Sequence, residues 1–457
     1  MITVKLLYAS NVHPEDSASH AAKTCHQDSL PALGERIDVR RSTFATGHHT
    51  TIQHFYLTFA IDGIAVGDVT FGLHLVSPFY NSDQRSGRFC AKMFLEPDFD
   101  RIMNYIYAFW PQLGAGQPQE ILSYLRKGIN LFQANISAAE KLARQLIAQE
   151  RPRASAGYLE KNAPNIAQEQ TRMFIPIVFP TGLDFTINLS ALAALHAAAW
   201  TPQLKHITGL MVKEVRAKWP EISYMFNREY RLMWWPETQK HWFSPVRIKY
   251  QPRVQLDHLD VNDCFQLPAP EIMHPIDQLH FRPEQMENSV YGIKTCVQLS
   301  VATMGQDQRH RTIARGLPKF TGDFYLPPIL RLLGLENSAK DLMTDWLRLA
   351  GKGLLPRTLV TILAPYGAIV AYKKSGSFNA LAHEQAKRLC WCAQEEIYHL
   401  SRLLRAQVRN RAGKNSELLG LFEPACLKNG VCIEGSRYCG RDLQKRDPKT
   451  YFPLRKI

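Results

Sequence analysis

The chain has 457 residues, of which 45% are hydrophobic and 21% charged, a composition typical of a globular protein with two or three domains. It lacks a run of about 18 uncharged apolar residues and a basic start followed by an apolar segment, so neither a membrane helix nor a signal peptide is expected. Nine scattered cysteines predict reduced thiols and a cytoplasmic location. The formal charge of +14 favours anionic partners such as nucleotides, folates with polyglutamate tails or nucleic acid, and a general basic bias explains it equally well.

The first ninety residues carry two polar segments beside predicted strands. Three histidines lie within the stretch Gly47–His54, just before the strand-like run Phe55–Ile61. No thiol or carboxylate accompanies them, so no metal is predicted there. Further on, Ser86-Gly87-Arg88 combines hydroxyl, backbone and guanidinium donors, as an anion cradle does. Taken alone, this loop is more typical of a surface turn.

Helical periodicity dominates the middle of the chain. Residues 97–150 are predicted to form helices that pack into the core. The polar stretch 151–168 contains Pro, Gly and Asn and is interpreted as a loop. Residues 228–274 are rich in Trp and Pro and are interpreted as a connector that packs on the body.

A second unit is predicted from residue 275. Its Arg309-His310-Arg311 follows the apolar run Cys296–Met304, which places the cations at the mouth of a buried element. Planar guanidinium donors suit phosphates and the carbonyl edges of bases or flavins, although a basic triplet by itself is typical of a solvated end. Helices are expected around 326–350 and as one continuous element over 382–408.

The tail, 412–457, contains Cys426, Cys432 and Cys439 at spacings wider than the usual metal-binding pairs. Three thiols need a fourth ligand, and Cys390, Cys392 or His399 could supply it. A structural zinc or iron–sulfur site is therefore an alternative. Thiols packed into the surface without a metal are favoured, so no metal site is predicted.

Several motifs, taken in order, resemble one enzyme family. The order Gly-His, Gln-His-Phe, Ser-Gly-Arg-Phe, Arg-x3-Pro and Asn-x-Ser-x-Leu is similar to that of the flavin-dependent thymidylate synthases (ThyX) over about residues 37–227. Their signature is Arg-His-Arg followed by Ser-x-Asn-Glu-x-Ser-x-Arg-Tyr. A second, weaker copy covers about 280–408, so the resemblance implies a tandem duplication.

The resemblance also implies the architecture. We expect an α+β fold of two ThyX-like units, each a sheet flanked by long helices, packed as a pseudo-dimer. The expected divisions are a first unit 1–227, the connector 228–274, a second unit 275–411 and the cysteine-containing tail 412–457. Two chains would form a homodimer equivalent to the family's homotetramer, a pseudo-tetramer with two active pockets.

Neither copy carries the whole signature. The matching residues of the first copy are Ser86, Arg88 and Arg172, and those of the second are Gln306, Arg309 and Arg388. In the family one subunit provides the first kind of residue and another subunit the second. We therefore expect two complementary half-sites that assemble one complete pocket. The remaining positions, which would form an inactive pocket without arginines, are Val76-Ser77-Pro78, Ala199, Thr361 and Lys319–Gly322.

The implied reaction is reductive methylation of dUMP at C5, with carbon from methylenetetrahydrofolate, hydride from reduced FAD, and NADPH as the reductant. By resemblance, Arg88, Arg172, Ser86 and the Gly87 amide would hold the dUMP phosphate and sugar. Arg388 would face the uracil edge and raise the nucleophilicity of C5, which makes Arg388 and Ser86 the catalytic candidates. The other implied positions are Gln306, Arg309 and Gln84 for substrate, and Arg309, His310, Arg311, His48, Asn188 and Gln84 for cofactor.

Two departures from the family pattern keep other functions open. Gln84 and Gln53 stand where the family has glutamates. An enzyme of the same fold acting on another pyrimidine nucleotide, or forming a hydroxymethyl product, is one alternative. A non-catalytic nucleotide- or nucleic-acid-binding protein is the other, and the basic tail suits it. Under the leading interpretation neither nucleic acid nor a membrane is an expected partner.

Overall fold

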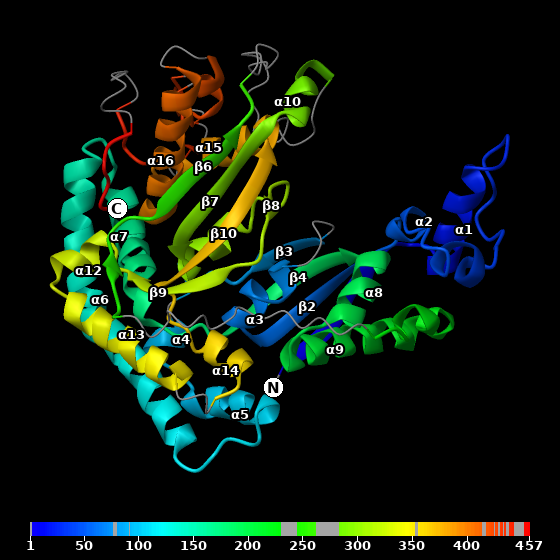
Figure 1. Ribbon diagram of the computed structural model, residues 1–457, viewed down its shortest axis with the longest axis horizontal. Coiled ribbons are helices and arrows are strands. Elements are labelled where there is room, and N and C mark those ends of the chain that lie inside the picture. Colours follow the sequence, from blue (N-terminus) through cyan, green and yellow to red (C-terminus); the bar gives the residue numbers. More distant parts are fainter. Residues whose placement is uncertain are drawn as a thin grey trace.

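The structure, a computed structural model, describes residues 2–457 apart from 76–79, 91, 230–244, 262–282, 352–354, 414–416, 425, 428–429, 433, 436–437 and 443–451. The described residues form an α+β fold with two largely antiparallel sheets, which confirms the expected class. Figure 1 shows α6, α7, α12 and α13 along one flank of the molecule and α1 and α2 at the opposite end. Among the described helices, none combines the length and apolar character that a membrane crossing requires.

The elements of the first half alternate between one sheet and its covering helices. The strands are β1 (Thr3–Ala9), β2 (Tyr56–Ala65), β3 (Tyr80–Gln84) and β4 (Pro180–Asn188). The α-helices are α1 (Pro14–Thr24), α2 (Thr50–Gln53), α3 (Val66–Thr70), α4 (Lys92–Leu95), α5 (Phe99–Phe109), α6 (Gln117–Glu150), α7 (Ala156–Thr171), α8 (Leu189–Ala198) and α9 (Pro202–Lys218). Short 3-10 or π turns are η1 (Arg40–Phe44), η2 (Leu73–Leu75), η3 (Arg172–Phe174) and η4 (Pro220–Phe226).

The second half is built in the same manner. Its strands are β5 (Ile248–Lys249), β6 (Arg253–Leu259), β7 (Gly292–Ser300), β8 (Ala314–Arg315), β9 (Lys319–Tyr325) and β10 (Ala368–Ser377). Its helices are α10 (Glu287–Val290), α11 (Val301–Asp307), α12 (Pro328–Leu332), α13 (Glu336–Gly351), α14 (Arg357–Ile362), α15 (Phe378–Arg388) and α16 (Glu395–Ala412), with the 3-10 turns η7 (Pro283–Gln285) and η8 (Glu417–Leu421).

The two sheets share one strand order. The first runs β1-β2-β4-β3, and each neighbouring pair is antiparallel. The second contains β6-β7-β10-β9 in the corresponding order, also antiparallel, with β5 added beside β9 and β8 beside β10. The central strands β2, β4, β7 and β10 each continue directly into a helix. At three of these junctions Asn188, Ser300 and Ser377 cap the helix by accepting a backbone N–H, which explains why the strand ends there.

The halves meet at an antiparallel backbone bridge between Pro176 and Pro365. On either side of the bridge the N–H groups of Ile177 and Tyr366 each donate across it at 2.9 Å, so the two segments bond reciprocally. One hydrophobic core surrounds this bridge and takes side chains from both halves, such as Phe174 and Trp346. The two halves therefore do not have separate cores at their junction.

Three local expectations were wrong. The stretch 151–168, interpreted as a loop, is mostly helix α7, because Tyr158, Ala163 and Ala167 are buried at helical spacing against neighbouring elements. The single helix expected over 382–408 is two helices, α15 and α16, separated by a turn that contains Cys390 and Cys392. The predicted connector contributes β5 and β6 to the second sheet, so that sheet begins before residue 275. Its three tryptophans, Trp234, Trp235 and Trp242, lie outside the described residues.

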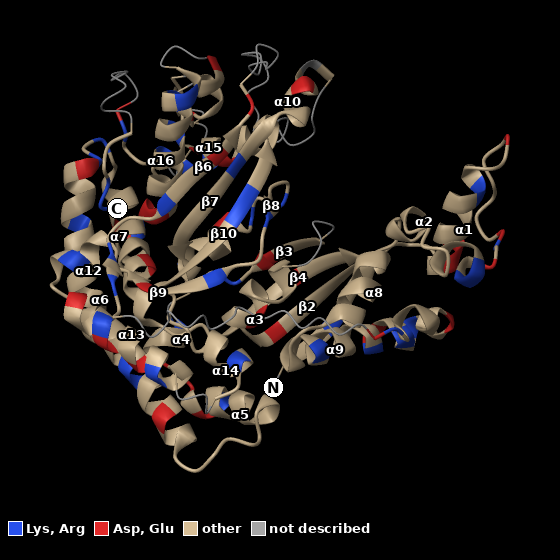
Figure 2. Ribbon diagram, viewed as in Figure 1, with Lys and Arg blue, Asp and Glu red and all other residues tan. Residues whose placement is uncertain are grey.

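Charged residues are distributed over many elements. Figure 2 shows Lys and Arg on α6, α9, α13, α16 and the second sheet, often beside Asp or Glu. Lys127 on α6, for example, forms an ion pair with Asp345 on α13 at 2.6 Å. Basic residues therefore lie on several described elements, and α16 alone carries Arg402, Arg405, Arg409 and Arg411.

Candidate active site

The Ser-Gly-Arg loop follows β3 and packs against α7 and is not a free surface turn. Its Gly87 carbonyl accepts a hydrogen bond from the Gln168 side chain at 2.8 Å, and the Arg88 N–H donates to the Ser86 hydroxyl at 3.2 Å. A Cβ on Gly87 would lie 3.2 Å from Nη1 of Arg172. Glycine is therefore needed for this close approach of the loop to the arginine.

Arg172 directly follows α7, as the first residue of η3, and is almost fully buried. Its guanidinium stacks on the Tyr366 ring of the second half, 4.9 Å from the ring centroid. Burial lowers the pKa of Arg172, and the nearby Glu169 partly offsets that effect. Glu169 also forms an ion pair with Arg88. Because Nε of Arg172 is buried without a hydrogen-bond acceptor in the described part of the protein, the group can still bind an anion.

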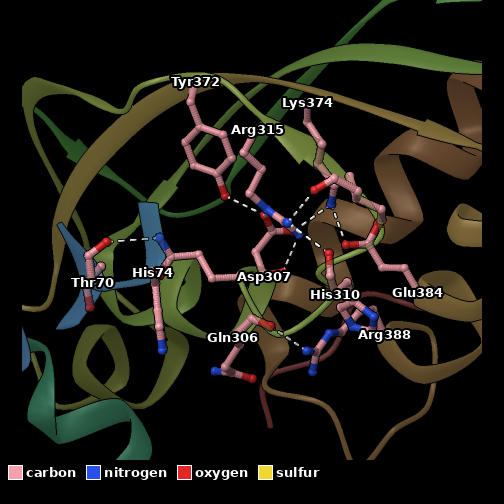
Figure 3. A network of polar contacts seen from close by, with 12 residues as sticks. Thr70, His74, Gln306, Asp307, His310, Arg315, Tyr372, Lys374, Glu384 and Arg388 are labelled. Carbon is pink, nitrogen blue, oxygen red and sulfur yellow. Dashed lines mark hydrogen bonds and ion pairs between the residues drawn. The ribbon is translucent and has the colours of Figure 1, made fainter. Parts of the chain in front are cut away.

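Arg388 ends α15 and lies beside the end of α11. Its Nη2 donates to the Gln306 carbonyl at 2.6 Å, as Figure 3 shows. Burial lowers the pKa of Arg388 to about 10, which still leaves the guanidinium charged at neutral pH. Both Nε of Arg388 and Oε1 of Gln306 are buried without a partner among the described residues. The Gln306 amide nitrogen instead donates to Gln394.

A buried network of charges holds these two helix ends together. Asp307 is fully buried and accepts from Lys374 and Arg315, each at 2.5 Å, and from the Tyr372 hydroxyl at 2.7 Å. Lys374 also pairs with Glu384 on α15. Burial alone would raise the pKa of Asp307, but Arg315 and Lys374 hold it well below its ordinary value. Figure 3 shows this network directly behind Arg388 and His310.

Arginines from the two halves converge in one chain. Arg388 is close enough to Arg88 and Arg309 for both cations to lower its pKa further, and Arg88 acts on Arg172 in the same way. Arg309 itself is exposed. We call the group Arg88, Arg172, Arg309 and Arg388 the arginine cluster. Neighbouring cations with donors that lack a partner among the described residues could hold a polyanionic ligand.

The other two members of the Arg-His-Arg triplet point elsewhere. Arg311 donates to the Ser82 hydroxyl at 2.8 Å and covers the Tyr80 ring of β3, 4.7 Å from its centroid. His310 is buried beside His383, and burial and the cation of Arg388 keep its pKa well below the ordinary value. His310 is therefore neutral at physiological pH, so only Arg309 of the triplet adds charge to the cluster.

Three other predicted positions have the following places in the fold. His48 is exposed near α2, at the end of the molecule with α1 (Figure 1). Asn188 is buried and caps α8, with its Nδ2 unpaired among the described residues. Gln84 ends β3, half-buried, and pairs with Leu183 of β4.

The structure describes three of the four segments that were assigned to the inactive pocket. Thr361 is buried in α14, Ala199 ends α8, and Lys319–Gly322 lie in β9. Val76-Ser77-Pro78 lie outside the described residues. None of the three described segments carries an arginine.

Sequence reasoning missed the buried carboxylates around the cluster. Glu396 accepts from the Ser300 N–H and the Thr303 hydroxyl, each at 2.6 Å, and burial raises its pKa to about 7. Glu395 accepts from the Tyr325 hydroxyl at 2.7 Å, and burial raises its pKa to about 8. The only sequence signal was two adjacent glutamates at a helix start, a pattern that is usually solvated.

Two cavities border the cluster and the triplet. One of 770 Å³ is lined by Arg88, Tyr158, Lys161 and Cys392 among others, between α7 and the turn before α16. The other, of 370 Å³, lies between the halves and is lined by His74, Tyr80, Arg311 and Tyr372 among others. In the described residues, no group of three or more His, Cys, Asp or Glu side chains is arranged to hold a metal ion.

Comparison with known proteins shows what this α+β chain is similar to. The sequence model of the family described as "Thymidylate synthase complementing protein" matches residues 6–221, somewhat less than half of the chain. This segment is therefore similar to that family, the ThyX family that the motifs resemble. No curated protein matches the chain.

Two solved structures illustrate the similarity. Thymidylate Synthase X (ThyX) from Helicobacter pylori, with FAD and dUMP, is 17% identical, with a TM-score of 0.34, over 50% of this chain and 98% of its own. A UMP/dUMP methylase, PolB, from Streptomyces cacaoi, bound with 5-Br dUMP, is 16% identical, with a TM-score of 0.29, over 50% of this chain and 94% of its own. Each neighbour is thus spanned almost entirely by about half of this chain.

Proposed function

We propose that the chain is a flavin-dependent thymidylate synthase that methylates dUMP at C5, with a pocket built from two repeated halves of one chain. The proposal rests on the similarity of residues 6–221 to that family and on one structural observation. Arg88 and Arg172 of the first half lie together with Arg309 and Arg388 of the second. These are the residues that the family pattern divides between two subunits.

The repeated architecture supports a tandem duplication packed as a pseudo-dimer. The strand orders β1-β2-β4-β3 and β6-β7-β10-β9 correspond one to one. At the junction, Pro176 and Pro365 face each other, and the hydrogen bonds beside them are reciprocal, as a two-fold axis requires. Under this proposal the first half supplies the Ser-Gly-Arg half-site and the second half supplies the Arg388 half-site.

The arginine cluster fits a nucleotide monophosphate. Arg88 and Arg172 would bind the dUMP phosphate, with the Ser86 hydroxyl and the Gly87 amide beside them. Arg388, held by the Gln306 carbonyl, would face the uracil carbonyls. A fixed cation there stabilises negative charge on the ring and so raises the nucleophilicity of C5.

Residues present also fit an anionic cofactor. The exposed Arg309, beside Arg388, can bind a pyrophosphate or a ring edge of FAD. When bound, reduced FAD supplies a hydride, with NADPH as its reductant and methylenetetrahydrofolate as the carbon donor. The helix α2 that follows His48 lies at the opposite end of the molecule from α7 (Figure 1), so we infer that a flavin contact by His48 would come from the second chain of a homodimer, the pseudo-tetramer. Asn188, as a helix cap, would act through its unpaired Nδ2.

A tritium-release assay tests the proposal. The wild-type protein, given dUMP tritiated at C5 with FAD, NADPH and methylenetetrahydrofolate, should release tritium. Arg388→Ala should reduce the rate by about 10²–10³-fold, the usual cost of removing one preorganised charge donor. The matched control is Arg216→Ala, because Arg216 also lies in the last turn of a helix but bonds only the exposed Asn227 among the described residues. Equal rates for both variants would refute the assigned role.

Gln84 is the specific observation in favour of a second candidate. It stands where the family has a glutamate, and loss of that carboxylate could change the preferred pyrimidine. The same assay with tritiated UMP and other pyrimidine nucleotides decides between substrates. A flavin-loaded protein that releases no tritium from dUMP would favour another pyrimidine. A protein with neither flavin nor release would leave a binding protein as the remaining interpretation.

A further inference from the structure

A cluster of thiols lies next to the turn that follows Arg388. Cys390 and Cys392 lie in the turn between α15 and α16, and the Cys392 N–H donates to the Cys390 sulfur at 3.5 Å. The Cys392 thiol is hydrogen-bonded to the thiols of both Cys390 and Cys439. Cys426 and Cys432 lie close to the same group. None of the eight described cysteines forms a disulfide.

The turn and the tail are held in fixed positions around these thiols. The Trp391 carbonyl accepts from Arg151 at 2.8 Å and from Arg455 at 2.7 Å. Near Cys439, Asp442 pairs with Arg153 at 3.0 Å. The tail is thereby anchored to the end of α6, so Cys392 and Cys439 are kept in contact although 47 positions separate them in the sequence.

We propose that Cys392 and Cys439 are a redox modification site, which forms a reversible disulfide with a small-molecule disulfide as the oxidant. Cys392, which is hydrogen-bonded to Cys439, lines the 770 Å³ cavity that also contains Arg88, so a small oxidant can approach the pair from that side. Cys390 is a poorer partner, because a bond between residues only two positions apart would close a very small ring.

The surroundings provide the thiolate that this chemistry needs. The hydrogen bond from Cys392, helped by the cation of Arg151, lowers the pKa of Cys439 to about 6, although burial opposes the shift. Cys439 is therefore the thiolate of the pair at neutral pH, whereas the hydrogen bonds to Cys390 and Cys439 and burial raise the pKa of Cys392, which keeps its proton.

The exchange balances in two steps. The Cys439 thiolate attacks one sulfur of the oxidant RSSR, which forms a mixed disulfide and releases RS⁻, and RS⁻ takes the proton from Cys392. The Cys392 thiolate then attacks the Cys439 sulfur and releases a second RS⁻, which is protonated by solvent. Two protein thiols are oxidised, and one small disulfide is reduced to two thiols.

Mass spectrometry of the full-length protein tests this proposal. The reduced protein is equilibrated in buffers of oxidised and reduced glutathione, quenched in acid and alkylated. We expect two of the nine thiols to be lost, and trypsin to yield peptide 389–402 joined to peptide 438–441. Cys392→Ser and Cys439→Ser should abolish this link. Cys390→Ser and the exposed Cys25→Ser should keep it.

Each other outcome overturns the proposal. Nine reactive thiols in every buffer would exclude the disulfide, and a link between Cys390 and Cys392 would exclude its assignment. Zinc or iron that copurifies and protects the thiols until it is removed would make the cluster a metal site. Because the linked wild-type peptide is decisive by itself, a variant that fails to fold does not affect the conclusion. The test is independent of dUMP chemistry.

Discussion

The arginine cluster depends on charges that lie behind it and do not face a ligand. Asp307 and Glu384 balance Lys374 and Arg315 in the interior, and the cations of the cluster lie just outside this balanced group. Removal of one partner leaves an uncompensated buried charge, which is far more costly than the loss of a surface ion pair.

Lys374→Met tests this at a single side chain. We expect the free energy of unfolding to fall by about 3–5 kcal/mol, because Asp307 and Glu384 would remain buried without their shared cation. Lys127→Met is the matched control, since the half-exposed pair of Lys127 with Asp345 should contribute about 0–1 kcal/mol. Urea unfolding monitored by fluorescence measures both. Equal effects would show that the buried network does not hold the fold.

Glu395 makes stability depend on pH. Burial raises its pKa to about 8 from an ordinary 4.5, so the folded protein keeps a proton that the unfolded chain releases. The contribution of this group to stability is therefore lost as pH rises from about 4.5 to 8. Glu395→Gln should reduce that decline, and Glu140→Gln on the surface of α6 should not. Urea unfolding from pH 5 to 8 measures how the free energy of unfolding changes with pH. If both variants showed the wild-type dependence on pH, the assignment to Glu395 would be wrong.

At the residue scale the sequence could identify the arginines but not their surroundings. Arg88, Arg172, Arg309 and Arg388 follow from a motif pattern, and their role in one pocket stays a prediction. The partners Asp307 and Lys374 are 67 positions apart, and no motif links them. Glu395 and Glu396 have the sequence features of solvated helix-start residues, and only the packing of the shared core shows that they are buried.

Among the elements, α7 shows how composition can mislead. Its Pro, Gly and Asn residues predicted a loop, but the apolar face that packs on α6 outweighs them. The break between α15 and α16 was also missed, because helical periodicity continues across the turn at 390–393. The strand-to-helix junctions at Asn188, Ser300 and Ser377 have capping residues, which are local signals.

Pro164 lies in the interior of α7 and is expected to lower the stability of that helix. It provides no N–H for the helical hydrogen bond, and its ring crowds the preceding turn. Pro164→Ala should therefore raise the free energy of unfolding by about 1–3 kcal/mol. Pro118→Ala, in the first turn of α6, should change it by less than about 0.5 kcal/mol, because a proline is accommodated there. Chemical unfolding of both variants measures these changes. A Pro164→Ala variant that is less stable than the wild type would contradict the prediction and show that Pro164 makes a stabilising contact.

At the scale of the whole molecule, packing at the junction of the two halves contributes to the free energy of unfolding. α3 of the first half approaches α14 of the second at Gly67, where a Cβ would lie 2.8 Å from Cγ2 of Ile362. The α+β class could be expected from the resemblance. The reciprocal backbone bridge at Pro176 and Pro365 could not, because it joins residues from the two halves without a local signal.

Gly67→Ala should lower the free energy of unfolding by about 1–3 kcal/mol, since Ile362 lies in a packed core and must shift. Gly209→Ala is the matched control. It is also helical, but nothing lies within 4 Å of its added Cβ, so it should raise stability by about 0.5–1 kcal/mol. Thermal and urea unfolding measure both. A neutral Gly67→Ala would mean that the two halves can move apart at little cost.

The single backbone that crosses the junction has a consequence for how the cluster behaves on dilution. Arginines on separate chains meet only as often as the chains associate, so such a site depends on protein concentration. Here Arg172 and Arg388 are covalently connected, and their effective local concentration is set by the length of chain between them and not by the solution. The arginine cluster should therefore persist at concentrations where a site shared between dissociating subunits would be lost.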